Sequence, residues 1–189
     1  PDYGRPEVRQ YFRDNALMWI EKYHCDGLRM DATSYIRYEG GGLGFDTEIL
    51  EGIIMMRDIN AEIRHKYPNT ITIAEDLKAD NIITAPTENG GIGYGTQWDM
   101  KFVHPVREVL TALNDDERDL QKIVDAIVYK YNDDVFNRVI YTESHDEVAN
   151  GKARVPEEIQ PGDAESSFAK KRSILGLVLV MTSPGIPMI

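Results

Sequence analysis

The stretch Asp26-Gly27-Leu28-Arg29-Met30-Asp31-Ala32 contains a short apolar segment that is typical of a buried strand and ends in a carboxylate. Arg29 and Asp31 are two residues apart, so on a strand both side chains point to the same face. A guanidinium can hold a carboxylate through two parallel hydrogen bonds, which would suit Asp31 to act as a nucleophile. A purely structural ion pair fits the same two residues.

Two further predicted strands also end in carboxylates. Residues 70–74 are rich in β-branched side chains and run into Glu75, and residues 138–142 lead to His145 and Asp146. The carboxyl ends of parallel strands meet at one edge of a sheet, where α/β enzymes carry their active sites. The three acids are therefore candidates for one acid-rich site, with His145 as a hydrogen-bond donor beside it.

Helical periodicity accounts for much of the remaining chain, because apolar residues recur at spacings of three and four. Strands and helices alternate, which predicts an α/β fold with a parallel sheet. A barrel and an open doubly wound sheet both fit this alternation. Helices are expected at 6–23, 47–67, 120–131 and 166–181, a last strand at 185–189, and loops at 40–44, 80–95 and from 146 to about 163.

The composition excludes several classes of function. The 189-residue chain has 21 Lys and Arg against 32 Asp and Glu, a net charge of −11. Such a chain repels nucleic-acid phosphates and anionic membrane surfaces. Its longest apolar run, 174–181, is far shorter than the ~20 residues that span a bilayer. Cys25 is the single cysteine, which excludes an intramolecular disulfide and a multi-cysteine zinc site.

A cluster of carboxyl groups at strand ends supplies what acetal cleavage needs. One carboxylate attacks the anomeric carbon, a second carboxyl protonates the leaving oxygen, and nearby charge stabilises the oxocarbenium-like transition state. An acid-lined Mg²⁺ site is the competing interpretation of the residues alone. Taken one at a time, each acid also fits a helix N-cap or a surface position, and Tyr94 and Trp98 fit packing aromatics.

The segment around Asp31 resembles the nucleophile strand, the fourth of the (β/α)8 barrel, in the α-amylase superfamily (glycoside hydrolase family 13). Residues 72–76, Thr-Ile-Ala-Glu-Asp, resemble the fifth-strand motif that carries the general acid/base. Residues 143–148, Glu-Ser-His-Asp-Glu-Val, resemble the seventh-strand motif, and residues 183–188 are similar to the eighth strand. The resemblance covers nearly the whole chain.

Carried over residue by residue, the resemblance implies that Asp31 is the nucleophile, Glu75 the general acid/base and Asp146 the stabiliser of the transition state. Arg29 and His145 match two residues of the family's substrate site. The implied substrate is an α-1,4-glucan such as glycogen, starch or maltooligosaccharides. No cofactor and no metal are implied. A glycogen-type substrate and the single cysteine favour the cytoplasm.

Within the superfamily, the loops are similar to those of α-1,4-glucan branching enzymes. The similar segments are 32–38 after the nucleophile, 90–94 with 98–100, and 144–148 followed by Asn-Gly-Lys at 150–152. They predict a retaining transglycosylase that forms α-1,6 branches by double displacement. The alternatives are an α-amylase-type hydrolase of α-1,4-glucan and a non-catalytic barrel fragment or glucan-binding module.

Residues 1–189 are expected to form a partial catalytic domain, the second half of a (β/α)8 barrel from about strand 4 to strand 8. Both ends of the chain look cut, since it opens without Met and stops in an apolar segment. A complete barrel typically takes about 250 residues. The family's third-strand motif, with its sugar-binding Asp and His, is absent from the sequence. We therefore expect the chain alone to be inactive.

Overall fold

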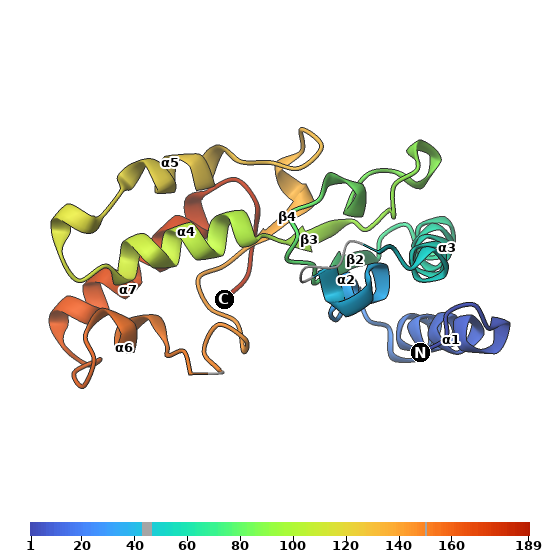
Figure 1. Ribbon diagram of the computed structural model, residues 1–189, viewed down its shortest axis with the longest axis horizontal. Helices are drawn as coiled ribbons and strands as arrows, with labels where there is room; N and C mark the ends of the chain where they lie inside the picture. Colours follow the sequence, from blue (N-terminus) through green and yellow to red (C-terminus); the bar gives the residue numbers. More distant parts are fainter. Residues whose placement is uncertain (43–46, 150) are drawn as a thin grey trace. The chain divides into compact units, whose positions relative to one another are not determined.

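A computed structural model describes residues 1–42, 47–149 and 151–189 (Figure 1). The chain divides into two compact units, Pro1–Trp98 and Asp99–Ile189. Each unit combines helices with parallel strands, as the alternating sequence pattern predicts. Within the described ranges, no helix has both the length and the apolar character that crossing a bilayer requires.

The first unit places helices against a parallel sheet in which β1, β2 and β3 follow one another in chain order. Its helices are α1 (Pro6–Tyr23), α2 (Thr33–Arg37) and α3 (Leu50–Lys66), its strands are β1 (Gly27–Met30), β2 (Ile71–Ala74) and β3 (Thr96–Trp98), and its 3-10 turns are η1 (Glu39–Gly42), η2 (Asn81–Ile83) and η3 (Thr87–Asn89).

The register of β1 and β2 sets the geometry of the candidate site. Met30, the last residue of β1, lies opposite Ala74, the last residue of β2. The ladder continues one step further, because the Glu75 N–H donates to the Met30 carbonyl over 3.0 Å. Asp31 and Glu75 therefore leave the sheet side by side, as the sequence predicts for neighbouring parallel strands.

The core of the first unit is formed mainly by α3 and α1. The apolar side chains of α1 recur at helical spacing, which turns one face of the helix towards the interior. His24 then ends α1 in the left-handed conformation, at φ 55°, and the chain turns into β1. The most enclosed apolar residues on the two helices are Ala16, Leu17, Ile20, Ile53, Met55, Met56, Ile59 and Ile63.

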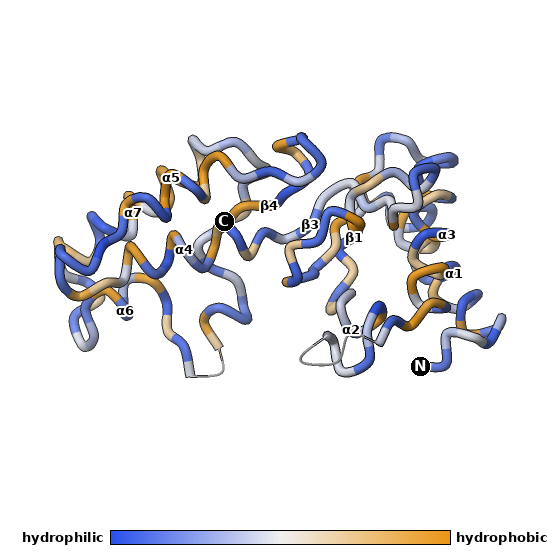
Figure 2. The backbone as a smooth tube through the Cα atoms, turned by 45° about the horizontal axis from the view of Figure 1, so that its top comes forward, coloured by the Kyte–Doolittle hydropathy of each residue, from blue (hydrophilic) through white to orange (hydrophobic). Residues whose placement is uncertain are grey.

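In the second unit, β4 and β5 pair in parallel and α4 packs against α5, α6 and α7. Hydrophobic and hydrophilic residues alternate along α4 and α5, as in helices with one buried face (Figure 2). The elements are α4 (Met100–Thr111), η4 (Asp115–Glu117), α5 (Leu120–Val128), η5 (Val135–Asn137), β4 (Arg138–Ile140), α6 (Val155–Ile159), α7 (Ser167–Thr182) and β5 (Ile186–Pro187).

Most of the predicted helices and strands are confirmed, with ends that differ by a few residues. Four helices and strands were not predicted: the short helices α2 and α6, the strand β3 and the helix α4 that follows it. The predicted loop at 40–44 forms part of η1 as far as Gly42, and its last two residues lie outside the described residues. Asn150, quoted for its resemblance to branching enzymes, also lies outside them.

Candidate active site

Arg29 links the two carboxylates at the ends of β1 and β2. Its Nη1 lies 2.7 Å from Oδ1 of Asp31, and its Nη2 lies 3.8 Å from Oε2 of Glu75. The Asp31 side chain is 74% exposed, whereas that of Glu75 is 13% exposed. The structure thus brings together three of the five residues predicted for the site: an accessible carboxylate, an enclosed one and a guanidinium that contacts both.

Trp98, at the end of β3, supports the Arg29 side chain. The guanidinium carbon of Arg29 lies 4.2 Å from the centre of a Trp98 ring, which is cation–π geometry. Trp98 itself is buried, as expected for a packing aromatic. The ring therefore stabilises the Arg29 guanidinium at the position from which it contacts both carboxylates.

The residue after Asp31 contacts the Glu75 carboxylate through its backbone. Ala32 adopts the left-handed conformation, with φ 47° and ψ 46°, which is rare for a residue other than glycine. In this conformation its N–H donates to Oε2 of Glu75 over 2.5 Å. The strained turn after β1 therefore places a donor directly on the second carboxylate.

A buried ion pair lies behind these residues. Arg37, 1% exposed, donates through Nε to Oδ2 of Asp76 over 3.0 Å, and Asp76 is fully buried. The same arginine donates through Nη1 to Asp80 over 3.0 Å. Burial alone would lower the pKa of Arg37, but the carboxylates of Asp76 and Asp80 outweigh it and the pKa is raised. The guanidinium is therefore charged and fully paired.

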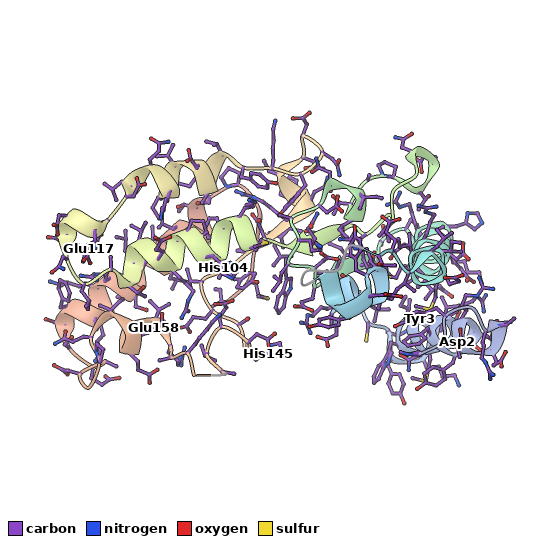
Figure 3. The ribbon with its side chains drawn as sticks, viewed as in Figure 1. Asp2, Tyr3, His104, Glu117, His145 and Glu158 are labelled. Atoms are coloured by element: carbon purple, nitrogen blue, oxygen red, sulfur yellow. The ribbon has the colours of Figure 1, made fainter. Side chains whose placement is uncertain are left out.

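His145 and Asp146 lie in the second unit, on the loop that follows β4. Figure 3 labels His145 on this loop. Nε2 of His145 is 3.3 Å from Oδ2 of Asp146, and the two side chains are 67% and 53% exposed. Both side chains are thus accessible to a ligand.

Glu147, the next residue, anchors this loop. Lys152 donates to its Oε2 over 3.0 Å, Nε2 of His104 on α4 lies 3.2 Å from its Oε1, and Arg107 lies 3.8 Å away. Burial alone would raise the pKa of Glu147, but the bonds from Lys152 and His104 outweigh it and the pKa is lowered. Glu147 is therefore an ionised carboxylate that holds the chain immediately after Asp146.

Sequence reasoning did not assign roles to Arg37, Asp76 or Glu147. Asp76 directly follows Glu75, and Glu147 directly follows Asp146. Their position next to a predicted catalytic acid is the only signal that the sequence gives for them. Arg37 and Asp76 are separated by 39 positions, so only the pairing of β1 with β2 brings them together. Across the described parts of the chain, no group of three or more His, Cys, Asp and Glu side chains is placed to hold a metal ion.

The chain resembles curated proteins over almost its whole length. It is 34% identical over 184 residues to the 1,4-alpha-glucan branching enzyme GlgB of Frankia casuarinae, covering 92% of this chain and 22% of that protein. It is 31% identical over 193 residues to the branching enzyme GlgB of Photobacterium profundum, covering 93% and 25%. The chain thus spans about a quarter of the length of these relatives. No protein-family model matches it.

Solved structures show the same fold at lower sequence identity. An Anoxybacillus alpha-amylase matches with a TM-score of 0.66 and 19% identity, over 98% of this chain and 35% of that one. A pullulanase from Anoxybacillus sp. LM18-11, complexed with maltotetraose, matches with a TM-score of 0.66 and 19% identity, over 100% and 27%. Together with the motif residues that end β1 and β2, these relatives show that the chain resembles the α-amylase superfamily, glycoside hydrolase family 13, and has the fold of part of its (β/α)8 barrel.

Proposed function

We propose that this chain carries the catalytic acids of a retaining transglycosylase that cuts α-1,4-glucan and forms α-1,6 branches. The observation that carries the proposal is the Arg29 guanidinium, which contacts both Asp31 and Glu75 at the ends of adjacent strands. The similarity to 1,4-alpha-glucan branching enzymes supports this reaction over others of the superfamily. Residues 1–189 would form part of one catalytic barrel domain.

In the first step, a carboxylate oxygen of Asp31 attacks C1 of a glucosyl unit. The bond between C1 and the glycosidic O4 breaks, and Glu75 gives its proton to the departing O4. The product is a glycosyl ester on Asp31, and the freed chain end leaves with a hydroxyl at O4. Asp31 suits the nucleophile because it is accessible and held by Arg29, and Glu75 suits the proton donor because it is more enclosed.

In the second step, the Glu75 carboxylate takes the proton of a 6-hydroxyl on an acceptor glucan. The 6-oxygen attacks C1, and the ester bond to Asp31 breaks. Two inversions at C1 retain the α-configuration, and Glu75 ends the cycle protonated, as it began. We assign Asp146 and His145 to binding sugar hydroxyls in the distorted transition state, a role for which their exposed side chains are suited. A glycogen- or starch-type glucan is the proposed substrate, and the cytoplasm the proposed compartment.

Hydrolysis is the second candidate function. Water would replace the 6-hydroxyl in the second step, and the three acids would keep their roles. The likeness in fold to an alpha-amylase and a pullulanase favours this alternative.

Product analysis of the complete protein that carries this sequence tests the two candidates. With amylose as substrate, new α-1,6 linkages detected by proton NMR, with little gain in reducing ends, support branching. A gain in reducing ends without new branches supports hydrolysis instead. Asp31→Asn should abolish either activity, and Asp2→Asn, an exposed aspartate outside the site, should leave it unchanged. Full activity of Asp31→Asn, or no turnover of the unsubstituted protein, would contradict the proposal.

A further inference from the structure

Glu75 is held at three points by the chain segment that surrounds Asp31. Its N–H donates to the Met30 carbonyl over 3.0 Å, and its own carbonyl accepts from the Thr33 N–H over 3.0 Å. Its carboxylate accepts from the Ala32 N–H over 2.5 Å. The distance between the two reacting carboxyl groups therefore depends on where residues 32 and 33 lie.

Thr33 is the link between this segment and the chain beyond Glu75. Its side chain is fully buried, and its hydroxyl lies 3.0 Å from the Glu75 carbonyl oxygen and 3.1 Å from Oδ2 of Asp76. A hydroxyl has one proton, so Thr33 shares it between these two acceptors. The hydroxyl thus couples the backbone of Glu75 to the carboxylate of Asp76.

Asp76 is in turn fixed by the far end of α2. It accepts from Nε and Nη2 of Arg37 over 3.0 and 3.3 Å, and from the backbone N–H of Lys78 over 3.2 Å. Replacing a buried ion pair of this kind by apolar residues of similar size is often neutral or stabilising. The Arg37–Asp76 ion pair is attached directly to Glu75 through the chain, and this position indicates a role other than stabilising the fold.

We propose that Arg37 and Asp76, acting through Thr33, are positioning residues that fix the carboxyl group of Glu75 relative to Asp31. The proposal rests on the proposed function, in which Glu75 transfers a proton in both steps. Because proton transfer requires close approach of its groups, a displaced Glu75 slows the steps that need a proton. Attack by Asp31 on a donor whose leaving group needs no proton keeps its rate.

Two glycosyl substrates distinguish the steps that need a proton from Glu75 from the step that does not, and both are tested on the complete protein. Release of a glucan chain from α-1,4-glucan requires a proton from Glu75. Release of fluoride from α-maltosyl fluoride does not, because the C1–F bond breaks to give fluoride ion as Asp31 forms its ester. The variants are Thr33→Val, which keeps the shape of the side chain and removes its hydroxyl, and Asp76→Asn, which keeps the shape and removes the charge. The fluoride burst reports glycosylation of Asp31, and kcat and KM on glucan report the full cycle.

The matched control is Asp99→Asn. Asp99 and Arg138 form a second fully buried pair, 3.1 Å apart, in the other unit. This variant loses the charge of a buried aspartate as Asp76→Asn does, but the hydrogen bonds of Asp99 go to Arg138, Tyr131 and the Lys101 N–H within the second unit. All assays are run well below the unfolding temperature of each variant, so that folded protein is compared with folded protein.

Thr33→Val and Asp76→Asn should each lower kcat on glucan about 10- to 100-fold, the scale expected for a misplaced reacting group, with KM within about twofold. Their fluoride burst should keep the rate of the unsubstituted protein, and Asp99→Asn should keep both rates. Equal decreases in the fluoride-burst rate and in kcat on glucan, or an unchanged kcat on glucan, would overturn the positioning role and leave the proposed function standing. If the unsubstituted protein gave neither a burst nor glucan turnover, the proposed function and this inference would both fall.

Discussion

Arg29 and Asp31 form a 2.7 Å ion pair at the carboxyl end of β1, and the same guanidinium lies 3.8 Å from Glu75. One side chain therefore contacts both carboxyl groups of the proposed double displacement. The two contacts use the two Nη atoms of the guanidinium fork, and the guanidinium carbon lies 4.2 Å from the centre of a Trp98 ring.

Replacement of Arg29 by lysine keeps the charge and removes the fork. A lysine ammonium cannot reach both carboxylates in one geometry, so one of the two charged contacts is lost. The two carboxyl groups are then no longer held relative to each other, and kcat/KM on glucan should fall about 10- to 100-fold. Steady-state kinetics of Arg29→Lys, with the exposed Arg5→Lys as control, checks this expectation. An unchanged kcat/KM would show that Arg29 does not act on the two acids together.

The strand ends were predictable because the residues that carry them follow simple patterns. Gly27–Met30 is apolar apart from Arg29, Ile71–Ala74 is apolar or β-branched throughout, and each is followed at once by an acid. The strand β3 was not predicted because it is only three residues long and has Gln97 at its centre. The helix α4 was not predicted because Pro105 interrupts the helical pattern.

The buried network around Glu75 could not be predicted for a different reason. Arg37 and Asp76 are charged residues of a kind that is usually exposed. Both are buried here, and the sequence pattern around neither residue indicates burial. Their pairing requires β1 to lie beside β2 in the observed register and α2 to fold back over it. Such long-range packing is set by the tertiary structure, not by the periodicity of either segment.

Glu147 should make the second unit sensitive to acid. Its pKa is lowered in the folded protein, so its stabilisation is present above the unfolded value of about 4.3 and is lost as pH falls through the folded pKa. Glu147→Gln should lower the free energy of unfolding at pH 7 by about 1.5 kcal/mol, the loss of a charged hydrogen bond. Urea denaturation from pH 7 down to pH 3 should show the two proteins converging at low pH.

The control for this experiment is Glu165→Gln. Glu165 also pairs with a lysine, Lys170, but its side chain is 88% exposed. Solvent screens such a pair, so the urea midpoint should change little at any pH. A constant difference between Glu147→Gln and the unsubstituted protein at every pH would contradict the role assigned to the ionised carboxylate.

Removal of one partner of the buried pair Asp99–Arg138 should destabilise the second unit. Asp99 accepts from Nη1 of Arg138 over 3.1 Å and from the Tyr131 hydroxyl over 2.9 Å. Asp99→Asn leaves the buried guanidinium without its counter-ion and should cost about 3 kcal/mol. Tyr131→Phe removes one neutral donor and should cost about 1 kcal/mol. Urea unfolding measures both, and a larger loss for Tyr131→Phe than for Asp99→Asn would reverse the assignment.

Gly52 should not tolerate alanine, although alanine is the better helix former. Gly52 lies in the first turn of α3, and a glycine-to-alanine change within a helix normally stabilises by up to about 1 kcal/mol. A Cβ on Gly52, however, would lie 2.1 Å from the backbone carbonyl oxygen of Ile36 on α2. Backbone must move to accept it, and we expect a loss of about 1–3 kcal/mol.

The same substitution links packing to catalysis, because α2 carries Thr33 and Arg37. If α2 moves away from α3, the contacts of these residues with Glu75 and Asp76 lengthen, and kcat on glucan should fall together with stability. Ala61→Gly is the matched control: it weakens an exposed turn of α3 by about 1 kcal/mol through helix propensity, and α2 is untouched. Gly52→Ala should therefore lower both kcat on glucan and the free energy of unfolding, whereas Ala61→Gly should lower only the free energy of unfolding. Equal kcat values for the two variants in their folded states would show that the packing of α2 on α3 does not affect catalysis.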